Sequence, residues 1–392
     1  MYTSKNYKYY IICFVFILIL RLYIIENNKI SEKINNIIDN KSSNYLEITP
    51  LNELFNSMIS KNTILIFEPN TYHHECIPGY TKYFIDLGYN VDILTHKSGI
   101  DSLNLFQEFE NIKLFIFNGQ KEMDKISQNF SSIIKKYDYI LLQSTDIKKK
   151  TLNFQIDLLK VNNSIFVFHE IRWAGKTFSS YFDKNRIWTL GNLSKGLQVN
   201  PHYFGNITIK NKNRRTRFFL TSSAHRNYSY LIESLKRLKK ERFNFEIIII
   251  GRGKRLDPKD IPQNLLDNFI FKQRVSYAEL YKYIQKSYYI VIPLDPDSKN
   301  DIQYRISKVT GSIQLVYGFL KPAIINEKFA DFYNLNTNNS LLYNNFNLYN
   351  ILRKAILLNN KAYKNLQNDL CVVEKEIYKI SFNNVKKTII EL

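Results

Sequence analysis

The feature that most constrains the fold is a regular alternation of short apolar runs with amphipathic stretches. It extends from Asn62 to Gly205 and resumes after Arg217. Apolar runs of four to eight residues that alternate with helical patterns are typical of parallel sheets built from strand–helix–strand units. In the first region we expect six strands, at Thr63–Phe67, Val91–Leu94, Leu114–Phe117, Tyr139–Leu142, Ile165–Phe168 and Arg186–Leu190.

The length of the chain allows two such domains. The 392 residues, 45% of them hydrophobic, are enough for two domains with separate cores. We therefore predict an α/β protein with two doubly wound, Rossmann-like domains. The expected boundaries are a tail at 1–8, a membrane anchor at 9–25, a stem at 26–60, a first domain at 61–205, a linker at 206–215, a second domain at 216–345 and C-terminal helices at 346–392.

In the second domain, phosphate-binding signals follow the predicted strands. The run Arg217–Leu220 leads into the small polar turn Thr221-Ser-Ser-Ala224, and the run Phe245–Ile250 ends in Gly251-Arg-Gly253-Lys254. Glycines after a buried strand let backbone N–H groups and a helix N-terminus approach a phosphate closely. Because ligands of such sheets bind beyond the carboxyl ends of the strands, these loops are the expected binding site.

The order of several motifs adds specificity. Arg226-Asn227 opens one helix, Ile250-Gly251 ends a strand, Val275–Leu280 opens a later helix, and Gly318-Phe-Leu-Lys-Pro322 precedes the strand Ala323–Ile325. Over roughly residues 213 to 330 this series resembles the C-terminal domain of GT-B glycosyltransferases, of the family 4 or group 1 type. The resemblance implies two domains facing a cleft, a nucleotide diphosphate-sugar as co-substrate and no other cofactor.

The same resemblance implies that Ser222, Ser223 and Arg226 hold the diphosphate of the donor. Further donor-binding residues are expected in the loops and helix starts of the second domain: Gly251, Gly253, Lys254, Ser276, Lys308, Gly311, Ser312 and Gln314. One departure stands out, because members of this type have two glutamates before the Gly-x-Pro element. Here the stretch Lys308–Gln314 contains neither, so the donor sugar and the stereochemical outcome stay open.

The charge fits an anionic substrate. The net charge is +20, and residues 212–330 contain 23 Lys and Arg against 11 Asp and Glu. Such a field raises the local concentration of a dianionic sugar nucleotide. Nucleic acid is not the expected partner, since the chain has no zinc-finger spacing, aromatic RNA-binding signature or basic recognition helix.

Two loops of the first domain are candidates for proton transfer. The first predicted strand is followed by a loop that contains His73, His74 and Glu75, and the fifth is followed by His169. A neutral histidine near a carboxylate has a pKa suited to taking a proton from a sugar hydroxyl. We predict that these four residues are catalytic and face an acceptor that is a glycan, a lipid or a protein. The alternative is that one or more of the histidines only packs against or caps its loop.

No metal site is expected. Asp295-Pro-Asp297 follows a buried strand, and paired aspartates of this kind bind a divalent cation in the other glycosyltransferase fold. The proline and the position late in the chain favour a turn instead. The three cysteines, Cys13, Cys76 and Cys371, have no metal-ligand spacing.

The N-terminus carries a membrane signal. Tyr9–Ile25 is apolar except for Arg21, and Lys5 and Lys8 precede it. Seventeen residues are the lower limit for crossing a bilayer of about 30 Å, and the lysines favour a cytoplasmic N-terminus. We predict an uncleaved, single-pass signal anchor with the catalytic domains lumenal or external, and a signal peptide is the alternative.

These features together predict a membrane-anchored, metal-independent glycosyltransferase. A sugar-nucleotide epimerase of the same fold is one alternative, although its soluble substrate needs no anchor. A catalytically inactive, membrane-anchored sugar-binding or scaffold protein is the other, and the missing glutamates favour it.

Overall fold

The computed structural model describes residues 46–56, 59, 61–99, 109, 112–145, 158, 161–172, 183–205, 207, 211–212, 215–221, 226–251, 256, 258–273, 275–344 and 346–391. They all belong to one compact unit, Leu46–Leu392. Two parallel sheets organise this unit, and we call the parts built on them the first half and the second half. Helix α12, at Asn360–Glu391, contacts both halves.

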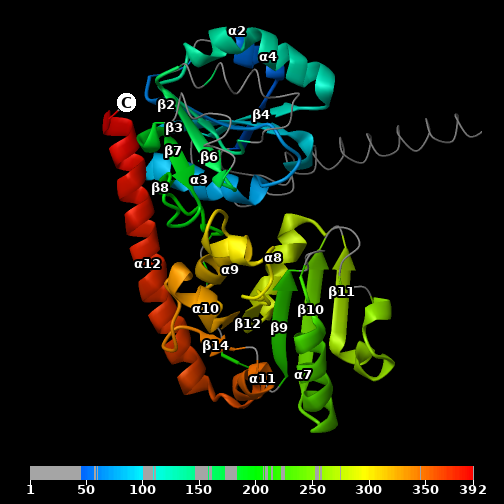
Figure 1. The fold of residues 1–392 in the computed structure, drawn as a ribbon. Coiled ribbons are helices and arrows are strands. Elements are labelled where there is room, and N and C mark those ends of the chain that lie inside the picture. The colour runs from blue at the N-terminus through cyan, green and yellow to red at the C-terminus, as the bar shows by residue number, and fades with distance from the viewer. Residues whose placement is uncertain are drawn as a thin grey trace, which may run out of the picture. The chain divides into compact units, whose positions relative to one another are not determined.

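The first sheet has eight parallel strands in the order β1-β4-β3-β2-β5-β6-β7-β8 (Figure 1). Apart from β1 at one edge and β8 at the other, this is the doubly wound order, which reverses between β2 and β5. The strands are β1 Leu46–Thr49, β2 Thr63–Glu68, β3 Asn90–His96, β4 Ile112–Phe117, β5 Tyr139–Leu142, β6 Ser164–Phe168, β7 Ile187–Thr189 and β8 Leu197–Gln198.

The second sheet has six parallel strands in the order β11-β10-β9-β12-β13-β14, which is the Rossmann order with its reversal between β9 and β12. The strands are β9 Thr216–Thr221, β10 Phe245–Gly251, β11 Phe269–Gln273, β12 Tyr289–Ile292, β13 Ala323–Asn326 and β14 Leu341–Tyr343. In both sheets, ligand-binding loops are therefore expected where the strand order reverses.

Helices pack on the sheets in the usual α/β manner. The α-helices are α2 Leu51–Asn56, α3 Ile77–Asp86, α4 Gln120–Ile134, α7 Ser229–Lys240, α8 Tyr277–Lys286, α9 Ser312–Gly318, α10 Glu327–Ala330, α11 Leu348–Leu357 and α12. Short 3-10 helices are η1 His74–Cys76, η4 Lys184–Arg186, η5 Pro258–Asp260, η6 Gln263–Asn268, η7 Ile302–Arg305 and η8 Asp331–Tyr333.

The central strands are buried on both faces. Every residue of β2 is buried, and so are the first six residues of β10, Phe245–Ile250. Continuous runs of β-branched and aromatic residues suit a parallel sheet that helices cover on both sides. Along β10 the side chains alternate between two cores, since Ile247 and Ile249 join one cluster while Ile248 and Ile250 join the other.

Helix α12 ties the two halves together, as the red helix in Figure 1 shows. Near its start, the Tyr363 hydroxyl donates to the Tyr288 carbonyl at 2.7 Å, next to β12 of the second sheet. Near its end, Trp188 of β7 donates from Nε1 to Thr388 Oγ1 at 2.9 Å. One continuous helix thus holds both sheets.

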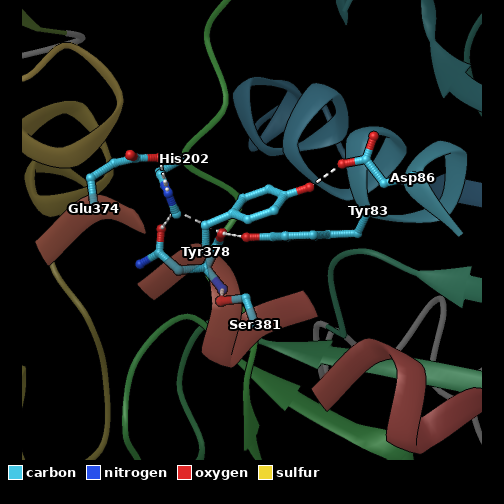
Figure 2. A network of polar contacts seen from close by, with 7 residues as sticks. Tyr83, Asp86, His202, Glu374, Tyr378 and Ser381 are labelled. Carbon is cyan, nitrogen blue, oxygen red and sulfur yellow. Dashed lines mark hydrogen bonds and ion pairs between the residues drawn. The ribbon is translucent and has the colours of Figure 1, made fainter. Parts of the chain in front are cut away.

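A polar network joins α12 to the turn at residues 199–205 (Figure 2). The His202 ring lies between Asn200 and α12, with Nδ1 3.0 Å from the Asn200 carbonyl and Nε2 3.1 Å from Glu374 Oε1. The Tyr83 hydroxyl of α3 donates to the same Asn200 carbonyl at 2.6 Å, and Ser381 Oγ accepts from the Asn200 N–H. This turn, the hinge turn, is therefore fixed to α3 and α12 at once.

Two glycines let the hinge turn pack so closely. A Cβ on Gly79 of α3 would lie 2.5 Å from Pro201 Cα, and a Cβ on Gly318 of α9 would lie 2.2 Å from Phe204 Cδ2. Contacts this short are not tolerated without movement of the neighbouring backbone or ring.

Most of the predicted strands are confirmed, with ends that move by one or two residues. Helices α11 and α12 lie in the region 346–392, where C-terminal helices are predicted. Strands β11 and β14 were not expected, since Phe269–Gln273 and Leu341–Tyr343 are short and flanked by polar residues. The stem prediction is wrong for residues 46 to 56: β1 pairs with β4, and α2 packs against β4 and α4.

The predicted membrane anchor, Tyr9–Ile25, lies outside the described residues, as do residues 1–8 and the stem up to residue 45. Among the residues that the structure does describe, no helix is both long enough and apolar enough to span a bilayer.

Candidate functional site

A single cavity of about 610 Å³ brings the candidate residues of both halves together. Its wall from the first half includes Tyr72, His73, Glu75, His169 and Glu170. Its wall from the second half includes Arg226, Gly251, Tyr304, Lys308 and the start of α9. The described residues of the first half come from the segments after β2 and β6, while Arg226 comes after β9 and Gly251 ends β10. The cavity therefore lies at the carboxyl ends of both sheets, as the parallel strand order leads one to expect.

The loop after β2 presents His73 and Glu75 in a tight turn. His73 is in the left-handed region with φ of 69°, and its carbonyl accepts from the Cys76 N–H at 3.0 Å as the 3-10 helix η1 begins. Gln143, just after β5, donates from its side-chain amide to the same carbonyl. The two strands on either side of the reversal therefore fix the backbone of His73.

His73 and Glu75 form a carboxylate–imidazole pair. His73 Nδ1 lies 3.6 Å from Glu75 Oε1, and Glu75 Oε2 accepts from the Tyr277 hydroxyl at 2.9 Å. Burial acts to raise the pKa of Glu75, but the hydrogen bond and charge of His73 and the Tyr277 hydroxyl outweigh it, so that the pKa falls to about 2. Glu75 is thus ionised at neutral pH and able to orient the His73 ring.

His169, just after β6, stacks on His73. The ring centroids are 3.7 Å apart and the planes differ by 16°. Burial lowers the pKa of His169 well below its ordinary value, and the nearby His73 charge lowers it further. His169 is therefore neutral at neutral pH.

A second carboxyl, Glu68, lies beneath this loop at the end of β2. It is fully buried, with Oε1 accepting from the Asn70 N–H at 2.8 Å and Oε2 2.5 Å from the Ser144 hydroxyl. Burial raises its pKa to about 8, which the hydrogen bonds only partly offset. Sequence reasoning did not select Glu68, because nothing in the sequence marks the last residue of a strand as buried.

His74 has a different environment from His73. Its side chain is 1% exposed, it is not among the residues that line the cavity, and its ring would lie 2.4 Å from a Cβ on Gly99. The ring packs against the Gly99 backbone, so the packing alternative fits His74 while His73 and His169 face the cavity.

The opposite wall carries positive charge. Arg226 donates from Nη2 to Thr310 Oγ1 at 3.1 Å, and its guanidinium carbon lies 5.7 Å from the centre of the Tyr304 ring. Lys308 Nζ lies 4.7 Å from the centre of the same ring. Both cations thus lie beside the Tyr304 ring in the wall of the cavity. Cation–π contacts and hydrogen bonds of this kind still allow a cation to bind an anion.

The start of α9 adjoins these cations. Gly311 and Ser312 line the cavity, and Gln314 comes next with its Oε1 3.6 Å from the Cys76 Sγ of the other half. Burial, together with the charges of Glu75 and Glu68, raises the pKa of the Cys76 thiol, so the thiol keeps its proton and is the donor of this contact.

Most of the predicted donor-binding residues that the structure describes lie at this wall. Arg226, Gly251, Lys308, Gly311, Ser312 and Gln314 all line the cavity. Ser276 does not, since its hydroxyl accepts from the Glu279 N–H at 3.2 Å and caps α8. Ser222, Ser223, Gly253 and Lys254 lie outside the described residues.

Four aromatic residues of the cavity were not expected from the sequence, namely Tyr72, Tyr277, Tyr281 and Tyr304. With 28 tyrosines in the chain, none of the four stands out by type. Tyr277 lies in a motif that marks a helix start, and only the fold shows that this start faces Glu75.

Asp295 and Asp297 form a turn after β12. The Asp297 N–H donates to Asp295 Oδ1 at 2.9 Å, and the Asp295 N–H donates to Asp301 Oδ2 at 3.0 Å. Asp295 lines a different, smaller cavity. Within the described ranges, no group of three or more His, Cys, Asp or Glu side chains is placed to hold a metal ion.

Neither protein-family models nor curated proteins match this sequence. Solved structures do match its fold. TarM has a TM-score of 0.53 at 10% identity, with 85% of this chain and 99% of TarM covered. A glycosyltransferase from Rickettsia africae has a TM-score of 0.52 at 13% identity, with coverages of 85% and 99%. HepE from Anabaena, solved in complex with UDP-glucose, has a TM-score of 0.51 at 11% identity, with coverages of 84% and 100%.

The chain has the GT-B fold. The resemblance seen in the second half of the sequence is thus confirmed at the level of fold, and it extends to the first half. In GT-B terms, the cavity between the carboxyl ends of the two sheets is the cleft between the two Rossmann-like domains.

Proposed function

We propose that the chain transfers a sugar from a nucleoside diphosphate-sugar to an acceptor hydroxyl on a glycan, a lipid or a protein, without a metal ion. The observation that carries the proposal is the cavity itself, where a GT-B fold brings a carboxylate–imidazole pair from one half against two cations from the other. Inverting sugar transfer uses these two functions, a base for the acceptor and positive charge for the leaving group.

His73 is the proposed base. Glu75 remains ionised and orients the ring through Nδ1, and the neutral His169 stacks on its face. His73 removes the proton from the acceptor hydroxyl, whose oxygen then forms a bond to the anomeric carbon of the donor sugar. The bond from that carbon to the phosphate oxygen breaks, and the nucleoside diphosphate leaves with the electron pair. A base directed at the acceptor suits an inverting transfer.

Arg226 and Lys308 are the proposed partners of the diphosphate, with the backbone N–H groups at the start of α9 beside them. Charged hydrogen bonds of this kind stabilise a leaving phosphate without a cation. The complex of HepE with UDP-glucose supports a nucleoside diphosphate-sugar as the donor class. The sequence also predicts Ser222, Ser223, Gly253 and Lys254 as donor-binding residues.

A donor panel tests the proposal. The purified chain is incubated with radiolabelled UDP-, GDP-, dTDP- and ADP-sugars, with and without a mixture of glycan and lipid acceptors. Release of the nucleoside diphosphate together with a glycosylated product supports transfer. Conversion of the donor to another sugar nucleotide without an acceptor indicates an epimerase, and no turnover of any donor indicates a binding protein.

We also propose that Tyr9–Ile25 anchors the chain in a membrane with its catalytic domains lumenal or external. The full-length chain should then resist carbonate extraction and be protected from protease in sealed vesicles. A soluble or shortened chain would contradict the anchor.

A further inference from the structure

Glu75, the carboxylate paired with the proposed base His73, accepts a hydrogen bond from Tyr277 of the second half. We propose that Tyr277 is a positioning residue, which orients the Glu75–His73 pair for proton transfer and makes this orientation depend on the contact between the two halves. The proposal rests on the proposed function, in which His73 is the base.

The geometry around Glu75 carries the proposal. Glu75 has one oxygen toward each partner: Oε1 is 3.6 Å from His73 Nδ1, and Oε2 is 2.9 Å from the Tyr277 hydroxyl. A carboxylate held at both oxygens has a defined plane, which fixes the direction from which it faces the imidazole. With one partner removed, the carboxylate rotates about its last bond, since that torsion is broad.

Tyr277 is itself firmly placed. It is the first residue of α8, directly after the capping residue Ser276, whose hydroxyl accepts from the Glu279 N–H. Its ring centroid is 6.1 Å from that of the buried Tyr281 one turn later. The hydroxyl that meets Glu75 therefore moves with the second half and not with the loop of His73.

Two other contacts cross between the halves at the same place. Glu170, next to His169, forms an isolated antiparallel bridge with Lys308, and the Ile171 N–H donates to the Ser307 carbonyl at 2.8 Å. Cys76, next to Glu75, contacts Gln314. Both loops that carry the stacked histidines are thus attached to the second half, and of these three contacts it is the Tyr277 hydrogen bond that acts directly on the pair.

The pKa of Glu75 agrees with this role. Burial raises the pKa of Glu75, but the hydrogen bond and charge of His73 outweigh this effect, and the Tyr277 hydroxyl adds a smaller lowering of the pKa. When the halves separate, Glu75 loses one of these donors. His73 is consequently oriented as a base only while the halves enclose the cavity, which limits proton transfer to the assembled site.

The test compares Tyr277→Phe with Tyr283→Phe. Both substitutions remove one hydroxyl from α8, but Tyr283 is not among the residues that line the cavity. We expect kcat to fall about tenfold in Tyr277→Phe, the scale of one lost hydrogen bond to a charged group, while KM for the donor stays within about twofold. The acid limb of the pH profile of kcat should move to lower pH, because His73 without an oriented carboxylate is a weaker base. Tyr283→Phe should match the wild type in all three.

A double-mutant cycle separates positioning from a structural effect. If Tyr277 acts through Glu75, then adding Tyr277→Phe to Glu75→Gln should lower kcat by less than about twofold, since the partner is already altered. Additive losses would show that Tyr277 acts elsewhere and would overturn the proposal.

A readout without catalysis distinguishes this proposal from the proposed function. The His73 ring is followed by NMR through its titration, with His73→Gln used to assign the signal. In Tyr277→Phe the pKa of His73 should fall relative to the wild type and Tyr283→Phe. A His73 titration that is unchanged or moved upward overturns the positioning role. If the wild type turns over no donor, the proposed function is wrong. The titration of His73 still tests whether Tyr277 orients the Glu75–His73 pair.

Discussion

The six central strands of the first sheet have the same order as the six strands of the second, but the strands of the two sheets lead to different residues. The order reverses beside β2 in the first sheet and beside β9 in the second. Strand β2 ends in the buried Glu68 and leads to His73 and Glu75, whereas β9 ends in Thr221 and leads toward Arg226. The same backbone scaffold thus presents an imidazole–carboxylate pair on one side of the cavity and cations on the other.

This difference shows how the fold separates an imidazole–carboxylate pair on one sheet from cations on the other. If an imidazole base and a phosphate-binding cation lay side by side on one loop, the positive charge would lower the pKa of the imidazole and make it a weaker base. Placing them on separate sheets keeps the imidazole beside a carboxylate and the cations beside a tyrosine ring. This comparison predicts that substitutions in the first half affect turnover and those in the second half affect donor binding.

The largest expected effect is on turnover. His73→Ala should lower kcat by roughly 10²–10⁴-fold, the usual contribution of a general base, and leave the affinity for the nucleoside diphosphate unchanged. Steady-state kinetics and calorimetry measure the two quantities. His96→Ala is the matched control, since His96 lies in β3 and is not among the cavity-lining residues. Equal losses in both variants would indicate a folding defect, and an unchanged kcat in His73→Ala would remove His73 as the base.

The next effect concerns the stability of the first half. Glu68 has a pKa of about 8 in the folded chain against 4.5 ordinarily, so between these values the folded state binds more protons than the unfolded state. The free energy of unfolding therefore falls as the pH rises through this window. Glu68→Gln should remove this dependence and gain roughly 3–4 kcal/mol relative to the wild type between pH 5 and pH 8. Urea unfolding at both pH values measures the gain, and parallel pH dependences in the two proteins would contradict it.

Much of the fold was predictable because the parallel strands are continuous apolar runs. Tyr139–Leu142 is found as predicted, and the other five expected strands of the first half agree within two residues at each end. The edges were less predictable. Leu46–Thr49 is only four residues long, it follows the polar stretch Asn40–Asn44, and only its pairing with β4 makes it a strand.

The site was predictable as a set of loops but not as a set of contacts. His73, Glu75 and His169 were identified from residue type and from their place after strands, and Arg226 from the resemblance. The partners of these residues were not: Tyr277 is 202 positions away from Glu75, and Tyr304 joins Arg226 and Lys308 only through the fold. Local periodicity contains no information on such distant pairs.

A smaller effect is expected from the second half. Arg226→Met should weaken the binding of a nucleoside diphosphate by roughly 1.5–3 kcal/mol, the scale of a charged hydrogen bond, with less effect on kcat than His73→Ala has. Calorimetry with UDP and GDP measures this. Arg353→Met removes a half-exposed guanidinium of α11 and serves as the control. If Arg226→Met binds as tightly as the control, Arg226 is not a diphosphate ligand.

The smallest expected effect is that of metal removal. If Arg226 and Lys308 neutralise the leaving diphosphate, turnover in EDTA should stay within about twofold of its value in Mg²⁺ or Mn²⁺. The alternative assigns this role to Asp295 and Asp297, whose carboxylates would then have to bind a cation. In the structure Asp295 accepts from the Asp297 N–H within its turn and lines a cavity separate from that of His73. Comparing Asp295→Asn with Arg226→Met in EDTA therefore shows which positive group stabilises the leaving diphosphate. Activity that is lost in EDTA, restored by Mn²⁺ and abolished by Asp295→Asn would assign this role to a metal ion and not to the two cations beside Tyr304. The proposed division of roles between the two sheets would then be wrong.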